Sequence, residues 1–259
     1  PCVMMSPSTA AQYLPKKTDI FDVLIIDEAS QMKPEQAFSL IARCKQMIIV
    51  GDQKQLPPSS RFEKDYTSDE ILEDDVDVEY SESILELADK VIGSKNALSL
   101  GWHYRSRHTS LIDFSNYYFY DNKLTVFASN DVGSQVIHKP VENSQYRGGV
   151  NLPEVKAVMD ALLEQIKSDK EKSIIIATMN QQQESEVTLA LEAELQNNKM
   201  LRDFDSKHQG NLDELVVKKL EDIQGDERDV VIISTVYGPD ADGKITQMFG
   251  DINLSLIHI

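Results

Sequence analysis

The stretch FDVLIIDEASQ, residues 21–31, indicates most clearly which fold this chain adopts. Its apolar run at 23–26 is short and rich in β-branched residues, which predicts a buried strand. Two carboxylates, Asp27 and Glu28, follow that strand directly. Ligands of open α/β sheets bind at the carboxyl ends of strands, where one carboxylate can hold hydrated Mg²⁺ and another can accept a proton from water. An ordinary solvated turn is the alternative interpretation of the same two residues.

A second stretch of this kind is IIVGDQKQLPP, residues 48–58. It predicts another buried strand, which ends in Gly51 and Asp52, and a polar turn that contains Gln55. An amide N–H at Gln55 could donate to a phosphate oxygen, although the turn alone is also an ordinary structural feature. Twenty-five residues separate Asp27 from Asp52, the length of one helix and one strand. We therefore expect the two strand ends to lie side by side.

The rest of the chain alternates expected helices and strands in the same way. Pro34 is expected to open a helix with Phe38, Ile41 and Cys44 on one apolar face. Further apolar strands are expected at 173–177 and 229–236. Strands separated by helices predict an α/β fold with parallel sheets covered by helices.

Aromatic and basic residues are adjacent in HYRSR, residues 103–107. Tyr104 could stack on a purine base while the guanidinium of Arg105 neutralises a phosphate. A core aromatic cluster with surface charges is the alternative interpretation.

A fourth stretch, QGDERDVVIIS at 224–234, places polar residues before an apolar strand. Gln224 and Gly225 predict a close approach of the backbone to a ligand, and Glu227 lies just before the strand.

These four stretches, in this order, resemble superfamily 1 helicases of the Upf-like branch, which includes the nonsense-mediated-decay helicase. DEASQ resembles motif II of that branch, VGDQKQLPP motif III, HYRSR motif IV and QGDERDVVIIS motif V. SPSTAAQYLP, ESILELA and FSNYYFYDNKL are similar to large bacterial helicase-related proteins of the same branch. The resemblance extends from about Cys2 to Asn253.

The resemblance implies an ATP-dependent helicase or translocase that uses ATP and Mg²⁺ on single-stranded DNA or RNA. Asp27 would hold Mg²⁺ through water, Glu28 would be the catalytic base, and Arg105 would be an arginine finger. Gln55 would contact the γ-phosphate, and Asp52 would take part in coupling to the nucleic-acid site. Tyr104 would lie near the adenine and Glu227 near the ribose. Gln224 and Gly225 are also implied at the nucleotide.

The implied fold is two RecA-like P-loop NTPase domains, the first incomplete, with ATP hydrolysed in the cleft between them. Residues 1–97 would form the C-terminal part of the first domain, including an acidic loop at 61–80. Residues 98–253 would form most of the second domain, in which Thr178 would contact the nucleic-acid backbone. LSLIHI, at 254–259, would be an unrelated tail.

Two parts of the family's pattern are missing. A phosphate-binding loop, GxxxxGK[ST], should precede motif II, but the sequence has Gly-Lys only at 243–244, far downstream. After MFGDIN, at 248–253, the family continues into another motif with arginine fingers, where LSLIHI stands here. We therefore expect the chain to be a fragment that lacks the remainder of a longer motor.

Composition and charge limit the classes of protein that fit. The formal net charge of −17 argues against binding nucleic acid through the overall field, but 12 acidic and three basic residues lie within 61–90 alone. A local basic groove elsewhere stays compatible with this charge. No apolar run approaches the roughly 20 residues of a membrane span, and Cys2 and Cys44 show no pairing pattern, so a cytoplasmic protein is expected.

Two other functions stay open. One is a non-catalytic module that binds a nucleotide or nucleic acid, and the other is a nucleotide-dependent switch without unwinding activity. The acidic pair with Gln55 and Arg105 argues against the first, since an inactive site tends to lose such residues.

We expect this 259-residue chain on its own to hydrolyse ATP negligibly. Without a phosphate-binding loop it lacks the backbone N–H groups and the lysine that hold the β- and γ-phosphates. Phosphate release by the purified chain measures this. Robust turnover that Glu28→Gln abolishes would contradict the expectation.

Overall fold

The computed structural model describes residues 2–55, 58, 82–127, 133–223, 225–239 and 243. The expected acidic loop at 61–80, Gln224 and the expected tail at 254–259 lie outside these residues. The contacts between residues divide the chain into two compact units. The described residues of the first unit belong to Pro1–His103 and Asn116–Thr125, and those of the second belong to Tyr104–Ser115 and Val126–Ile259. The domain boundary after residue 97 stays a prediction.

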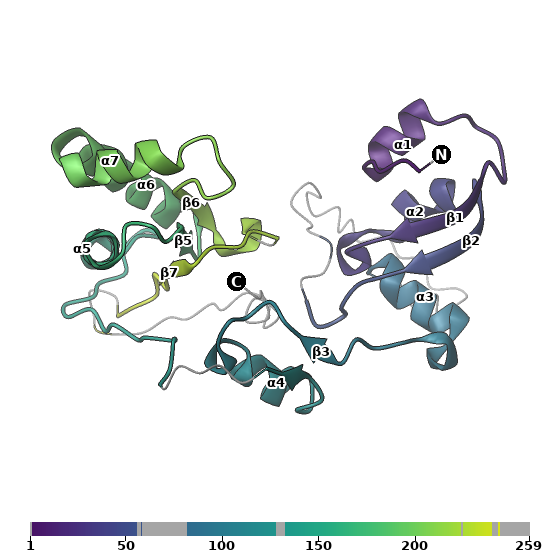
Figure 1. Ribbon diagram of the computed structural model, residues 1–259, viewed down its shortest axis with the longest axis horizontal. Helices are drawn as coiled ribbons and strands as arrows, with labels where there is room; N and C mark the ends of the chain where they lie inside the picture. The colour runs from purple at the N-terminus through teal and green to yellow at the C-terminus, as the bar shows by residue number, and fades with distance from the viewer. Residues whose placement is uncertain are drawn as a thin grey trace. The chain divides into compact units, whose positions relative to one another are not determined.

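Two parallel strands form the centre of the first unit (Figure 1). They pair in parallel with Ile26 opposite Ile49, so the carboxyl ends of both strands lie side by side, as the spacing predicts. The elements of this unit in chain order are α1 (Pro7–Tyr13), β1 (Phe21–Ile26), α2 (Pro34–Ile41), β2 (Cys44–Ile49) and α3 (Ile84–Ile92).

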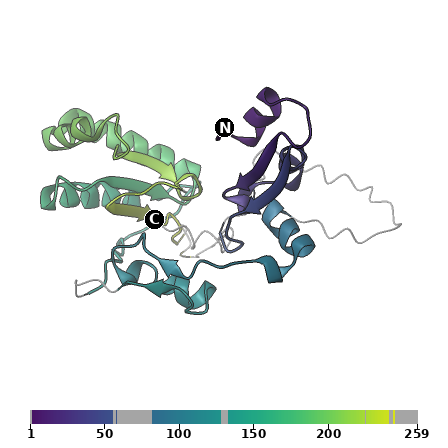
Figure 2. The same ribbon diagram turned by 45° about the vertical axis from the view of Figure 1, so that its right-hand side comes forward.

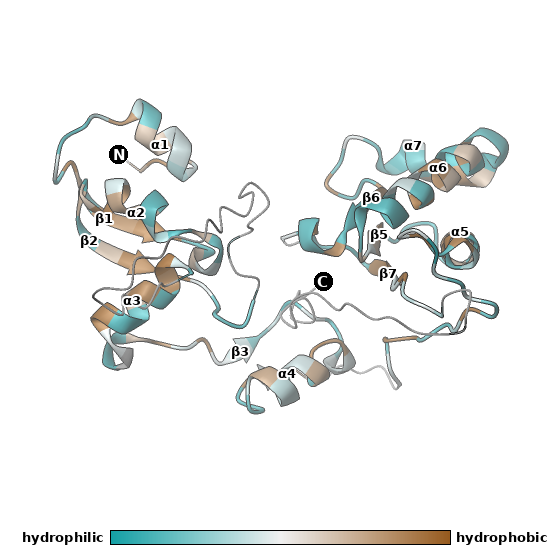
Figure 3. Ribbon diagram, turned by 180° about the vertical axis from the view of Figure 1, so that it is seen from behind, coloured by the Kyte–Doolittle hydropathy of each residue, from teal (hydrophilic) through white to brown (hydrophobic). Residues whose placement is uncertain are grey.

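The described elements of this unit cover one face of the two-stranded sheet. Ile26 on that face is buried against Ala37 of α2 and Ile84 of α3. Val23 and Ile25 alternate to the other face, where their side chains are 45% and 65% exposed. The strands are rich in apolar residues all the same (Figure 3). Strand β1 was predicted to be buried, but among the described residues it is buried on one face only.

Helix α2 begins at Pro34, as predicted, and Ile41 packs against the core of the unit, but the rest of the predicted face differs. Ala37 and Leu40 are buried, whereas Phe38 is 56% exposed. Cys44 is not helical at all, because α2 ends at Ile41 and Cys44 begins β2. The helical periodicity does not extend to Cys44 because the helix ends three residues earlier, at Ile41.

The second unit contains a three-stranded parallel sheet, which confirms the predicted α/β fold class. The central strand is buried along its whole length, and three helices lie on one side of the sheet (Figures 1 and 2). In sheet order the strands are β6 (Val216–Lys219), β5 (Ile174–Thr178) and β7 (Val230–Ser234). The helices are α5 (Leu152–Ser168), α6 (Gln181–Asn197) and α7 (Lys199–His208).

Helix α5 follows its sequence pattern closely. Asn151 caps its first turn by accepting a hydrogen bond from the Glu154 N–H, and Pro153 occupies that turn. Its apolar stripe packs against the central strand in the main core of the unit. The buried residues of that stripe are Val155, Val158, Met159, Leu162 and Ile166.

Short elements connect these regions. Two-residue strands β3 (Trp102–His103) and β4 (Thr125–Val126) pair with each other, and helix α4 (Asp113–Phe119) lies between them in the chain. Among the residues that the structure describes, no helix has the length and apolar character needed to cross a membrane.

Asp229, directly before β7, ties three parts of the second unit together. Its Oδ2 accepts hydrogen bonds from the backbone N–H of Ser173 at 3.1 Å and from the Ser173 hydroxyl at 3.0 Å. Its Oδ1 accepts one from Arg107 at 3.0 Å. The Ser173 hydrogen bonds, with the charge of Arg107 added, hold the pKa of Asp229 below its usual value.

We expect Ser173→Ala to raise the pKa of Asp229 more than Arg107→Ala does. The Ser173 hydroxyl bonds the carboxylate in a partly buried position, whereas the Arg107 side chain is 87% exposed and its charge is screened. Because the folded-state pKa is lowered, the stabilisation from Asp229 is present above its unfolded-state pKa and is lost as the pH falls through the folded-state value. Carboxyl ¹³C titration by NMR measures both variants, and a larger shift with Arg107→Ala would contradict the prediction.

Candidate functional site

The two carboxylates of the DEAS turn lie where the sequence predicts them, at the carboxyl end of β1. Both side chains are exposed. The Asp27 Oδ1 accepts a hydrogen bond from the Glu28 N–H at 3.0 Å, and the Glu28 Oε2 accepts one from Gln31 at 3.4 Å. The pair thus presents hard, negatively charged oxygens to solvent at the end of the sheet.

Glu28 has a left-handed backbone, with φ 51° and ψ 40°. A residue with a Cβ pays about 1–3 kcal/mol for such a conformation, which persists only when neighbouring contacts impose it. Here the buried Ala29 donates its N–H to the Val50 carbonyl at 2.9 Å, and Gln31 donates to the Glu28 carbonyl at 3.0 Å. Backbone strain of this kind concentrates at functional sites, which strengthens the case for Glu28.

Gly51 lets the end of β2 approach this turn. A Cβ at position 51 would lie 3.0 Å from the backbone nitrogen of Ala29 and 3.1 Å from that of Ser30. Such distances leave no room for a side chain without moving backbone. The glycine of VGDQ is therefore required by packing between the two strand ends, a role that its place in a turn did not reveal.

Asp52 organises the turn after β2. Its Oδ1 accepts from the Lys54 N–H at 2.9 Å, and its Oδ2 accepts from the Gln55 side-chain amide at 3.3 Å. Because the two strands are paired in parallel, the structure brings together four predicted residues at one end of the first sheet. These are Asp27, Glu28, Asp52 and Gln55.

Tyr120 also belongs to this group, although the sequence did not single it out. Its hydroxyl donates to the Asp52 Oδ2 at 2.5 Å across 68 residues of chain. Burial, together with the hydrogen bond to Asp52 and the charge of that carboxylate, raises the pKa of Tyr120. Tyr120 lies in the stretch FSNYYFYDNKL, which carries part of the resemblance but does not indicate a partner for it.

In the second unit, Tyr104 and Arg105 lie on an exposed segment. The Tyr104 side chain is 84% exposed. Arg105 makes no hydrogen bond or ion pair with any residue that the structure describes, whereas Arg107, two positions on, is bound to Asp229. Of these two arginines, Arg105 is therefore the one available to a ligand.

The loop before β7 carries Gly225 and Glu227, while Gln224 lies outside the described residues. Gly225 has a φ of 87°, a conformation that favours glycine. An ion pair between Lys218 and Asp226, at 2.7 Å, closes the loop, and the side chain of Glu227 stays exposed. The predicted nucleotide contacts of these residues stay predictions.

Thr178 ends the central strand of the second sheet and is fully buried. Its hydroxyl donates to the Asn180 carbonyl at 3.1 Å, in the turn where Asn180 caps α6. The hydroxyl thus serves the turn itself, and the expected contact with a nucleic-acid backbone stays a prediction.

The carboxylates of the first unit are suited to a Mg²⁺ ion that is also bound by the phosphates of a nucleotide. Within the described ranges no cluster of three or more His, Cys, Asp or Glu side chains could hold a metal alone. Mg²⁺ at nucleotide sites typically needs one or two carboxylates, with phosphate oxygens and water completing its octahedron. The exposed carboxylates of Asp27 and Glu28 fit that requirement.

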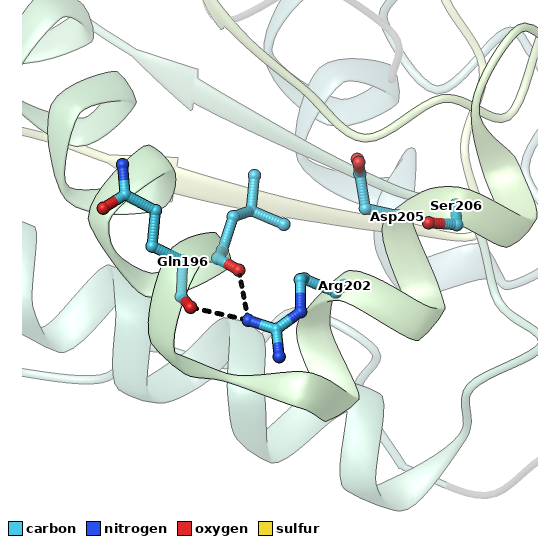
Figure 4. A pocket seen from close by; sticks show the side chains of 5 residues that line it. Gln196, Arg202, Asp205 and Ser206 are labelled. Carbon is cyan, nitrogen blue, oxygen red and sulfur yellow. Dashed lines mark hydrogen bonds between the residues drawn. The ribbon is translucent and has the colours of Figure 1, made fainter.

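A shallow pocket lies elsewhere, where α6 meets α7 (Figure 4). Arg202 donates to the carbonyls of Leu195 and Gln196 at 2.9 and 2.6 Å, and so completes the last turn of α6. The residues that line this pocket include none of those predicted to bind a nucleotide.

Comparison with known proteins gives two family matches, both described as an AAA domain, at residues 2–60 and 132–252. An uncharacterized ATP-dependent helicase of Mycoplasma genitalium, MG140, is 31% identical over 99% of this chain and 24% of its own length. Its Mycoplasma pneumoniae homologue is 32% identical with the same coverage. The chain thus spans about a quarter of the length of these curated relatives.

A more distant match is to the mouse protein named "Probable helicase senataxin", which is 27% identical over 87% of this chain and 8% of its own length. The two AAA-domain matches lie on either side of the segment with HYRSR, and DEASQ and QGDERDVVIIS fall within them. With these domains and this homology to ATP-dependent helicases, the chain belongs to the superfamily 1 helicases, in the Upf-like branch that senataxin fits.

Proposed function

We propose that this chain is part of an ATP-dependent helicase or translocase that moves along single-stranded DNA or RNA. The observation that carries the proposal is the group formed by Asp27, Glu28, Asp52 and Gln55 at one end of a parallel sheet. Relatives over nearly the whole chain are named ATP-dependent helicases. Two RecA-like P-loop NTPase domains would both contribute residues to hydrolysis.

In the first unit, the Glu28 carboxylate would accept the proton of the attacking water. Its strained backbone and the hydrogen bond from Gln31 hold the side chain at the end of β1. Asp27 would hold Mg²⁺ through water, and the bound ion would neutralise charge on the phosphates. The amide of Gln55 would donate to a γ-phosphate oxygen. Asp52 would take part in coupling the nucleotide site to the nucleic-acid site.

In the second unit, the free guanidinium of Arg105 would neutralise the charge that develops on the phosphates during transfer. The exposed ring of Tyr104 would stack on the adenine. The loop before β7, with Gln224, Gly225 and Glu227, would contact the rest of the nucleotide. Thr178 would lie near the nucleic-acid backbone.

The nucleic acid would be gripped by a local basic surface, because the chain as a whole carries a net charge of −17. Contacts to the backbone and stacking suit movement along a single strand without base readout. Binding would therefore weaken as the salt concentration rises. We place the protein in the cytoplasm, in keeping with its two unpaired cysteines.

In the full-length protein that contains these residues, we expect Glu28→Gln to lower the nucleic-acid-stimulated kcat for ATP by about 10²–10⁴-fold. Glutamine keeps the size of the side chain but cannot take the proton, so the KM for ATP should change little. Steady-state phosphate release measures both. Glu35→Gln, an exposed glutamate at the start of α2, is the matched control.

A Glu28→Gln variant as active as the control would contradict the proposed role of Glu28. A protein that hydrolyses ATP but never displaces a strand would indicate a switch or translocase in place of a helicase. A protein that binds nucleotide without hydrolysing it would indicate the non-catalytic module.

Arg105 and Arg107 provide a second comparison in the full-length protein. Arg105→Ala is expected to lower kcat by about 10³-fold or more, the effect of losing an arginine finger. Arg107→Ala should cost only a few-fold, since that guanidinium already binds Asp229 and its loss disturbs local structure alone. Single-turnover ATP hydrolysis separates the two variants. Equal losses would contradict the assignment of the finger to Arg105.

A further inference from the structure

Among the described residues, the carboxylate of Asp52 accepts one hydrogen bond from outside its own turn. The Lys54 N–H and the Gln55 amide, at 2.9 and 3.3 Å, are local donors within three residues. The third donor is the Tyr120 hydroxyl at 2.5 Å, which comes from a distant part of the chain within the same compact unit.

Tyr120 and Gln55 share a single acceptor atom. Both donate to the Asp52 Oδ2, whereas Lys54 bonds to the other oxygen. The bond from the half-buried Tyr120 restrains Oδ2, the same oxygen that accepts from the Gln55 amide. The backbone bond from the Gln55 N–H to the Asp52 carbonyl, at 3.1 Å, fixes the turn but not that amide.

A closed turn between α4 and β4 holds Tyr120 in this position. Asn122 donates its N–H to the Asn116 carbonyl at 2.9 Å, and the Asn116 side chain bonds both the N–H and the carbonyl of Leu124. Thr125, in β4, then donates to the Gly101 carbonyl at 2.6 Å, next to β3. The turn is thus joined to the strand that directly precedes Tyr104 and Arg105.

Charges near this turn are already paired among themselves. Asp121 and Lys123 form an ion pair at 2.9 Å on the exposed side, and Lys54 contributes its charge to Asp121. Among the contacts that the structure describes, the Tyr120 hydroxyl donates to the Asp52 carboxylate.

We propose that Tyr120 is a positioning residue which, through Asp52, orients the Gln55 amide and links the turn after β2 to the segment that carries Tyr104 and Arg105. The inference rests on the proposed function, because it gives Gln55 its role at the γ-phosphate. Tyr120 touches neither nucleotide nor nucleic acid in this scheme. Its contribution is to hold the motif III turn against the chain that leads to the arginine finger.

The hydrogen bond itself is tested on the 259-residue chain. ¹³C-labelled tyrosine, followed by NMR through alkaline pH, should show one residue that titrates above the usual value of about 10. Tyr120→Phe should remove that signal, and Asp52→Asn should bring its titration down toward the usual value. Titration of Tyr120 with the other tyrosines in the wild-type chain would overturn the proposal.

The positioning role is tested by ATP hydrolysis of the full-length protein with single-stranded nucleic acid. Tyr120→Phe keeps the ring and should lower kcat by about tenfold, the effect of losing one hydrogen bond to a charged group, with the KM for ATP within about twofold. Combined with Asp52→Asn it should cause no loss beyond that of Asp52→Asn alone. Tyr117→Phe, on exposed α4, is the matched control because it keeps the ring contact with Tyr118.

The outcomes separate this proposal from the proposed function. A wild-type protein without ATP hydrolysis overturns the proposed function and this proposal with it. An active wild type in which Tyr120→Phe equals Tyr117→Phe, or in which its loss adds fully to that of Asp52→Asn, overturns this proposal alone. The proposal is supported if Tyr120→Phe alone lowers kcat but causes no further loss when Asp52→Asn is already present.

Discussion

The Val50 N–H donates to the Ile26 carbonyl at 2.8 Å, and the Ala29 N–H donates to the Val50 carbonyl at 2.9 Å. These two bonds continue the parallel pairing of β1 and β2 beyond their last residues, so the turns that follow the strands start side by side. Parallel pairing brings like ends together, and here the like ends carry Glu28 and Asp52. The candidate site of the first unit depends on this alignment.

The same alignment explains why the backbone is strained where the chemistry is expected. Gly51 must lie against the backbone of Ala29, and Glu28 must turn through a left-handed conformation for Ala29 to reach Val50. The buried Ala29 makes this contact hard to relax. The packing of the two strand ends thus imposes one fixed orientation on an otherwise exposed glutamate.

Each unit contains a hydrogen bond that joins a carboxylate to a side chain from a distant part of the chain. Tyr120 joins the chain that follows α4 to Asp52 in the first unit, and Arg107 binds Asp229 in the second. Each bond uses a charged acceptor, which makes it stronger than a neutral one and dependent on the presence of both partners. Arg105, two positions before Arg107, has no hydrogen-bond or ion-pair partner among the described residues.

Local pattern was sufficient to predict the parallel α/β class and the two strand ends that lie side by side in the first unit, because strand signals act over a few residues. The exposed face of β1, the buried face of α2 and the early end of that helix were decided by what packs against each element, which periodicity does not specify. Only the tertiary structure brought Tyr120 to Asp52, because a contact across 68 residues leaves no periodic signal in the chain. By itself the sequence predicted which residues would carry the chemistry, because motif residues and their spacing are local features. The fold decided which of them are held by distant partners and where the backbone is strained, because both depend on how the strand ends pack.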